Sequence, residues 1–227
     1  MRSRATRSAA SRGSAGGKAG ARSGSRSNSS AGSPGQLRII GGRFRGSRLP
    51  VLRQAGLRPT GDRTRETLFN WLAPIVEGSR CLDCFAGAGA LGFEAASRGA
   101  SQVSMIERAD AVARQLVDNA ELLGATAVQV ITADALGWLS DQPAQAFDIV
   151  FLDPPFALGI LADACELLDR RGWVMAGSRV YLETDAGAGL PPLPPRWALV
   201  RDKRAGQVRY GLAEVGSGSD GEQLLGR

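Results

Sequence analysis

The chain has 227 residues, 43% of them apolar, and a formal net charge of +6. A chain of this length can bury one substantial hydrophobic core but hardly two, so we expect one folded domain. No apolar run approaches the roughly 20 residues of a membrane-spanning helix, and the N-terminus lacks the apolar core of a secretory signal. These features argue against a membrane protein and predict a cytoplasmic one.

Cysteine usage agrees with an intracellular location. The three cysteines, Cys81, Cys84 and Cys165, are an odd number and do not make a disulfide framework. Cys81 and Cys84 form a CxxC pair, but the chain has no second such pair and no histidine. A metal or redox site would need those partners, so we interpret the cysteines as buried small side chains and predict no bound metal.

Positive charge is concentrated near the N-terminus. Residues 1–65 hold 15 of the 28 Lys and Arg residues and a single acidic residue, Asp62. Residues 1–36 contain no Leu, Ile, Val, Phe, Tyr or Trp, which predicts a disordered tail that binds polyanions or aids solubility. A mitochondrial targeting segment would need the apolar stripe of an amphipathic helix, which this tail lacks. We expect a second disordered tail over residues 216–227.

Two basic elements follow the tail. Residues 37–57 alternate basic and apolar side chains around glycines, which predicts a short basic β-hairpin. The segment RPTGDRTRETLFNWL (58–72) has apolar residues at helical spacing, with Thr60 or Asp62 as a possible N-cap. Because the Arg guanidinium offers a planar fork of donors to phosphate, a dense arginine set favours nucleic-acid contacts over an ordinary solvated surface. Between residues 43 and 65 that set comprises Arg43, Arg45, Arg48, Arg53, Arg58, Arg63 and Arg65.

The rest of the chain alternates strand-like and helix-like segments. Apolar runs predict buried strands, and helical patterns such as ALGFEAASRG and AVARQLVDNAELLG lie between them. Strands with this composition and alternation predict a parallel sheet covered on both faces, whose ligands bind beyond the carboxyl ends of the strands. The predicted strands are residues 80–85, 101–107, 127–132, 147–153 and 178–184.

The first of these strands leads into a glycine-rich loop. Gly87, Gly89 and Gly92 spell GxGxxG, a pattern that lets a ligand approach the backbone at a helix N-terminus. The pattern alone suits a nicotinamide or flavin dinucleotide as well as S-adenosylmethionine. Glu107 ends the second strand, where a carboxylate can accept hydrogen bonds from both ribose hydroxyls. A solvated acid at a strand end is the simpler interpretation, but the glycines beside it favour a ligand.

Acids also end the third and fourth strands, at Asp134 and in the motif Asp153-Pro154-Pro155-Phe156. Asp-Pro and Pro-Pro are common in ordinary turns. A methyltransferase acting on an exocyclic amino group, however, needs two acceptors that aim the nitrogen lone pair at the methyl group. Asp153 and the Pro154 carbonyl suit that role, and Phe156 can stack on a base removed from its neighbours.

These motifs together closely resemble the RsmD family of bacterial 16S ribosomal RNA guanine-N2 methyltransferases. The resemblance covers about residues 37–215 and is carried by RIIGGRFRGSRLPV, RPTGDRTRETLFNWL, CLDCFAGAGALGFEAASRGA, FLDPPF and AGQVRYGLAEV. It implies a class I, Rossmann-like α/β fold with a seven-stranded, mostly parallel sheet whose last strand is antiparallel, and a methyltransferase domain over residues 58–215. It also implies an enzyme that acts, with S-adenosylmethionine, on a guanine in the helix 31 loop within the 30S subunit or a late assembly intermediate, and we expect it to be a monomer.

The resemblance also assigns roles to positions. The catalytic motif is Asp153, Pro154, Pro155 and Phe156, and Arg58, Thr60, Asp62 and Arg63 border cofactor and RNA. The cofactor is expected to contact Asp83, Phe85, Ala86, Gly87, Gly89, Glu107, Arg108, Asp134, Ala135 and Asp153. RNA is expected to contact Arg38, Arg43, Arg45, Arg48, Arg58, Arg63 and Arg65. The basic tail of residues 1–36 departs from the shorter members of the family.

Three other interpretations stay open at this point. An adenine-N6 DNA methyltransferase or a protein-glutamine methyltransferase would use a closely related proline-rich clamp. An NAD-dependent oxidoreductase would use the glycine loop for a dinucleotide, although it has no particular use for the DPPF motif. A catalytically retired RNA-binding assembly factor would keep the fold, but the joint presence of Gly87, Gly89, Glu107 and Asp153 argues against it.

Overall fold

The computed structural model describes residues 35–52, 61–155 and 159–217. Most of the predicted disordered tails, and also Arg58, Thr60 and Phe156, lie outside these residues. Strand β1 begins at Gly35, two residues before the expected start of the hairpin at residue 37.

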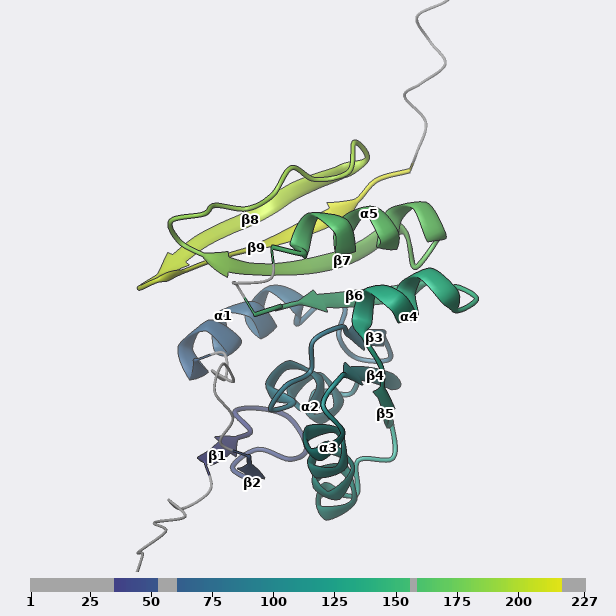
Figure 1. The fold of residues 1–227 in the computed structure, drawn as a ribbon. Coiled ribbons are helices and arrows are strands. Elements are labelled where there is room, and N and C mark those ends of the chain that lie inside the picture. Colours follow the sequence, from purple (N-terminus) through teal and green to yellow (C-terminus); the bar gives the residue numbers. More distant parts are fainter. Residues whose placement is uncertain (1–34, 53–60, 156–158, 218–227) are drawn as a thin grey trace, which may run out of the picture. The chain divides into compact units, whose positions relative to one another are not determined.

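A seven-stranded sheet forms the centre of the fold, in the order β5-β4-β3-β6-β7-β9-β8 (Figure 1). The strands from β5 to β7 are parallel, whereas β9 runs antiparallel to both β7 and β8. The expected mostly parallel sheet with an antiparallel last strand is therefore confirmed. The strands are β3 (Arg80–Asp83), β4 (Gln102–Glu107), β5 (Val128–Thr132), β6 (Phe147–Leu152), β7 (Val174–Asp185), β8 (Trp197–Ala205) and β9 (Val208–Val215).

The central strands are apolar throughout because both of their faces are covered. Successive side chains of a strand point to opposite faces, so Cys81 and Phe151 belong to one hydrophobic cluster while Leu82 and Val150 belong to the other. All four side chains are fully buried. The two clusters are the two halves of one core, divided by the sheet.

Five helices cover the two faces. Helices α1, α2 and α3 contribute buried residues to the first cluster, and α4 and α5 contribute to the second. Helix α1 begins after its N-cap residue, Gly61, which has no side chain that could accept a hydrogen bond. Of the two predicted N-caps, Asp62 is therefore wrong, and Thr60 lies outside the described residues. Asp62 lies instead in the first turn. The helices are α1 (Asp62–Leu72), α2 (Ala90–Ser97), α3 (Asp110–Leu123), α4 (Ala135–Asp141) and α5 (Leu161–Arg171).

The N-terminal basic segment forms the expected hairpin. Strands β1 (Gly35–Arg38) and β2 (Arg48–Val51) pair antiparallel as a separate two-stranded sheet. Its buried residues Leu37 and Leu49 belong to the same cluster as the helices α1 to α3. The hairpin is thus part of the domain core on that face and holds its alternate, basic side chains outward.

Two further features bear on function. Within the described ranges, no helix is both long and apolar enough to cross a bilayer, and no three His, Cys, Asp or Glu side chains gather as a metal site. Cys81, Cys84 and Cys165 are free and buried, as expected. Burial raises the pKa of the Cys81 thiol to about 12, so it is kept as an unreactive thiol.

Candidate functional site

The glycine loop joins β3 to α2 at the carboxyl edge of the sheet. Gly87 and Gly89 both have positive φ, at 49° and 77°, and Gly89 is the N-cap residue of α2. A Cβ atom at Gly89 would lie 2.5 Å from the ring of Phe93, and one at Gly92 would lie 2.2 Å from the methyl group of Met105. The sequence therefore requires glycine here for backbone conformation and helix packing, and the loop that results leaves backbone N–H groups at a helix N-terminus.

Asp83, at the end of β3, holds this loop in place. Its side chain is buried at the end of β3, and one carboxylate oxygen accepts a hydrogen bond from the Gly92 N–H at 3.1 Å. Burial raises the pKa of Asp83 to about 7, with a further rise from Glu107, although backbone donors at Gly92 and Phe85 act in the opposite direction. Asp83 is consequently a buried anchor of the loop whose carboxyl group titrates near neutral pH.

Glu107 lies at the end of β4, beside the loop. One of its carboxylate oxygens accepts from the Gly87 N–H at 3.1 Å and the other accepts from the Ala109 N–H at 2.8 Å. The side chain is half-buried, so its outer surface is open to a ligand. Each carboxylate oxygen has a second lone pair, and the two together can accept the hydroxyls of a ribose without losing the backbone contacts.

Asp134 follows β5 and begins the next helix. Its Oδ1 accepts from the Gly137 N–H at 3.0 Å, which makes it the N-cap of α4, while the side chain stays exposed. Ala135 is buried beside it, and Arg108 is exposed after β4. Because β3, β4 and β5 are adjacent, their terminal acids Asp83, Glu107 and Asp134 form a series along one edge.

These residues fit S-adenosylmethionine. A loop of tight glycine turns lets the ligand approach the protein backbone at the N-terminus of α2, and Glu107 offers paired acceptors to a ribose. The ends of β4 and β5 then carry the exposed face on which a base can lie. We refer to the ends of β3, β4 and β5 with the glycine loop as the cofactor half of the edge.

The proline-rich motif lies on the other side of β3. Asp153 is half-buried and Pro154 is buried directly after β6, and β6 pairs with β3. The structure thus places Asp153 at the same edge as the glycine loop, on the neighbouring strand. Phe156, which the sequence assigns to base stacking, lies outside the described residues.

Two polar residues near Asp153 were not predicted from the sequence. The hydroxyl of Tyr181 in β7 donates a hydrogen bond to Glu183 at 2.5 Å, and both side chains are buried. Burial raises the pKa of Tyr181 well above its ordinary value, and the charges of Glu183 and Asp153 raise it further. Asp153 therefore lies within electrostatic reach of this pair. We call the carboxyl ends of β6 and β7, with the start of β9 beside them, the target half of the edge.

The predicted RNA-contacting arginines divide into two groups. The side chains on the hairpin and at the start of α1 are exposed: Arg38, Arg43, Arg45, Arg48 and Arg63. Arg65 differs, because its side chain is 1% exposed and donates to the Arg38 carbonyl at 2.9 Å and to Asp62 at 2.6 Å. It offers no surface to RNA in this structure and instead joins α1 to the hairpin. Arg58 lies outside the described residues.

Glu94 and Ser97 on α2 hold the hairpin loop in place, and sequence reasoning missed both. The buried Glu94 carboxylate accepts from the Ile40 and Gly41 N–H groups at 2.9 and 2.8 Å, and Arg98 completes an ion pair with it at 2.8 Å. Ser97 Oγ accepts from the Phe44 N–H at 2.9 Å. The available signal was the glutamate inside the otherwise small and apolar run ALGFEAAS. Burying a charged glutamate is costly in free energy unless the charge is paired, so it predicts a partner.

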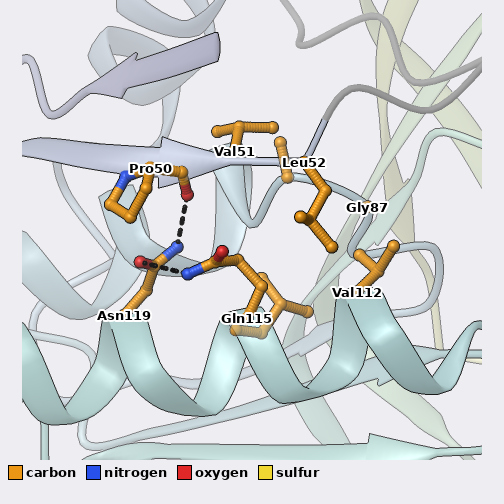
Figure 2. Close-up of a pocket in the computed structure, with 9 residues that line it drawn as sticks. Pro50, Val51, Leu52, Gly87, Val112, Gln115 and Asn119 are labelled. Atoms are coloured by element: carbon orange, nitrogen blue, oxygen red, sulfur yellow. Dashed lines mark hydrogen bonds between the residues drawn. The ribbon is translucent and has the colours of Figure 1, made fainter. Parts of the chain in front are cut away.

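A small pocket lies where the hairpin meets the glycine loop (Figure 2). Gln115 and Asn119 of α3 point toward β2, and Asn119 donates a hydrogen bond to the Pro50 carbonyl at 3.1 Å while accepting one from Gln115 at 3.3 Å. Gly87 of the glycine loop also lines the pocket. The hairpin is therefore bound by α3 as well as by α1 and α2, close to the glycine loop.

The sheet order, the glycine loop after β3, the acid at the end of β4 and the Asp-Pro-Pro turn after β6 define a Rossmann-like methyltransferase. Residues 37–214 match the protein-family model described as Conserved hypothetical protein 95. The chain belongs to this family, the RsmD family.

Individual relatives agree with this family assignment. The chain is 49% identical over 178 residues to Ribosomal RNA small subunit methyltransferase D of Escherichia coli K12, covering 78% of the chain and 89% of the relative. The protein of the same name from Haemophilus influenzae is 45% identical over 181 residues, which cover 78% of the chain and 93% of the relative. A solved Escherichia coli structure, described as a candidate methyltransferase yhhF, superposes with a TM-score of 0.76 at 45% identity, over 81% of this chain and 99% of that one.

Proposed function

We propose that the protein is an S-adenosylmethionine-dependent methyltransferase that methylates the exocyclic N2 of a guanine in the helix 31 loop of 16S ribosomal RNA. The observation that carries the proposal is the placement of Asp153 and Pro154 directly after β6, the strand next to β3, which leads into the glycine loop. The names of the relatives, Ribosomal RNA small subunit methyltransferase D, support the reaction and the class of substrate. The choice of guanine N2 and of helix 31 rests on the family resemblance.

The cofactor half holds S-adenosylmethionine in this proposal. Gly87 and Gly89 give the methionine part access to the backbone, Glu107 accepts the ribose hydroxyls, and Asp134 with Ala135 borders the adenine. The cofactor supplies an electrophilic methyl group, because its sulfur carries a positive charge. Asp83 supports this site from a buried position, since its bond to the Gly92 N–H fixes the loop.

Asp153 and the Pro154 carbonyl orient the target amino group. An exocyclic amine is a poor nucleophile because its lone pair is delocalised into the ring. Two acceptors that bind its two hydrogens fix the nitrogen with the lone pair directed at the methyl group, which is the positioning that an in-line transfer needs. Proline serves here because it has no N–H that would compete for these acceptors. Asp153 is the nearest acceptor for the proton that the amine loses.

The exposed arginines of the hairpin bind the RNA around the target. Arg38, Arg43, Arg45 and Arg48 are held outward by a hairpin that is fixed to α1, α2 and α3, so the cations form a pre-organised surface. Phosphate oxygens are the ligands that such a surface suits. We further propose that the enzyme acts as a monomer in the cytoplasm, on 30S subunits or late assembly intermediates.

The proposal is tested with 30S subunits from cells that lack the endogenous enzyme. The purified protein and tritiated S-adenosylmethionine are added, and the RNA is digested to nucleosides. We expect label in N2-methylguanosine. Label in DNA or protein and none in RNA would overturn the substrate while keeping the chemistry, and binding of the particle without any transfer would point to the assembly-factor alternative.

A further inference from the structure

A row of residues crosses the target half of the sheet, from the end of β6 to the outer strand β8. Asp153 follows the last residue pair between β6 and β7, and Glu183 is the next residue on β7. Glu183 pairs with Tyr210 in β9, and Tyr210 pairs with Lys203 in β8. Since neighbouring strands lie ~4.8 Å apart, Lys203 is three strands, or about 15 Å, from Asp153 along the backbone row.

Lys203 shares one face of the sheet with this aromatic region. Paired residues point to the same face, so Lys203 and Tyr210 lie together, and Arg201, two residues before Lys203, joins them. Trp71, from the last turn of α1, packs on Tyr210 with ring centroids 5.7 Å apart, and the Lys203 ammonium lies 5.6 Å from the Trp71 ring. This is a cation–π contact that fixes the position of the lysine head.

The two cations are exposed, whereas the nearby carboxylates have other roles. Arg201 and Lys203 are both exposed on β8, the outer strand beyond β9 (Figure 1). On the same face, Glu183 is buried and accepts the Tyr181 hydroxyl, and Asp185 accepts from the Gly187 N–H at 2.8 Å. Asp202 of β8 points to the opposite face, where it pairs with Arg209 at 2.7 Å.

We propose that Arg201 and Lys203, supported by Trp71, form a second RNA-binding surface that contacts backbone phosphates beside the target nucleotide. The proposal rests on the proposed function, because it places the RNA strand that carries the target base between Asp153 and β8. The hairpin packs on helices α1 to α3, away from β8 at the far end of the sheet order. The substrate is then bound from two sides of the catalytic motif, by the hairpin arginines and by the β8 cations.

The test uses the double variant Arg201→Gln, Lys203→Gln, which removes both charges and keeps side chains of some length. The matched control is Arg204→Gln, because Arg204 is exposed on the same strand and points to the opposite face. Methyl transfer to 30S subunits is measured over a series of salt concentrations, and the affinity for S-adenosylmethionine and the melting temperature are measured alongside.

We expect the double variant to lose about fivefold or more in kcat/KM for 30S subunits, with unchanged cofactor affinity. The slope of log kcat/KM against log salt should flatten by about 1.4, since each phosphate contact with single-stranded RNA contributes about 0.7. Arg204→Gln should match the wild type. A double variant that behaves like Arg204→Gln, or that loses kcat/KM with an unchanged salt slope, would overturn the proposal. If the wild type itself transfers no methyl group to ribosomal RNA, the proposed function fails instead.

Discussion

The two halves of the sheet edge are built from different kinds of contact. In the cofactor half, each terminal acid accepts from backbone N–H groups: Asp83 from Gly92, Glu107 from Gly87 and Ala109, and Asp134 from Gly137. In the target half, polar contacts join side chains to one another: Tyr181 donates to Glu183 two residues further along β7, and the charge of Asp153, which follows the neighbouring strand β6, acts on Tyr181. The cofactor half is therefore fixed by the loop backbone, whereas the target half is fixed by contacts between side chains.

Because of this difference, the two halves should affect different properties of the enzyme. A rigid backbone loop suits a ligand that is the same in every reaction cycle. A set of side chains around Asp153 suits the positioning of a group that is brought in by a large substrate. Substitutions in the cofactor half should mainly alter cofactor affinity, and substitutions in the target half should mainly alter turnover.

The largest effect is expected from Asp153→Ala. Turnover should fall about 100-fold or more, because the amino group loses its charged acceptor and its orientation. Affinity for S-adenosylmethionine, measured by calorimetry, should stay nearly unchanged. Asp118→Ala, which removes an exposed carboxylate from α3, is the control for loss of charge. Normal turnover in Asp153→Ala would show that Asp153 takes no part in the chemistry. It would also contradict the assignment of the target half to turnover.

Glu107→Ala should show the opposite pattern. We expect S-adenosylmethionine to bind about tenfold more weakly or worse, since hydrogen bonds to a charged group contribute about 1.5–3 kcal/mol. Turnover at saturating cofactor should change much less. Glu121→Ala, at an exposed position of α3, is the matched control. Equal cofactor affinity in wild type and Glu107→Ala would contradict the assignment of Glu107 to the ribose.

Tyr181→Phe tests whether the side-chain contacts of the target half affect the reaction. The variant removes the hydroxyl that donates to Glu183 and keeps the buried ring. We expect turnover to fall roughly three- to tenfold, because a buried hydrogen-bonded network beside Asp153 loses one member. Cofactor affinity should not move. A variant with unchanged turnover, or one with weakened cofactor binding, would show that Tyr181 does not act through the target half.

The same difference explains how much the sequence could predict. The cofactor half depends on contacts that are short along the chain or follow from strand order, so the spacing of Gly87, Gly89 and Glu107 was enough to bring them together. The parallel sheet covered on both faces followed from the alternation of apolar strands with helices, whereas its seven strands and its antiparallel last strand followed from the family resemblance.

The missed contacts that hold the hairpin join distant segments. Glu94 is 53 and 54 residues from the Gly41 and Ile40 N–H groups that it accepts, so its sequence neighbours give no sign of that role. Arg65 looked like its exposed neighbours, yet its position on the helix turns it toward the core and toward the Arg38 carbonyl. Charge composition predicts a basic surface, but only packing decides which arginine belongs to it.

The smallest effect on turnover is expected from Asp83, the buried acid of the cofactor half, whose protonation should affect stability instead. The pKa of Asp83 is about 7 in the folded protein against an ordinary value of 3.8, so the folded state holds a proton that the unfolded state releases. The free energy of unfolding contributed by this group should therefore fall as the pH rises from about 4 to 7 and level off above that range. Urea unfolding of the wild type and of Asp83→Asn between pH 5 and 8 should show a flatter profile for the variant, which has no proton to lose. Asp202→Asn is the control, because its exposed carboxyl has a lowered pKa and stays ionised throughout that range. Parallel profiles for wild type and Asp83→Asn would mean that Asp83 is already ionised at pH 5, and the loop would then be anchored by a charged carboxylate.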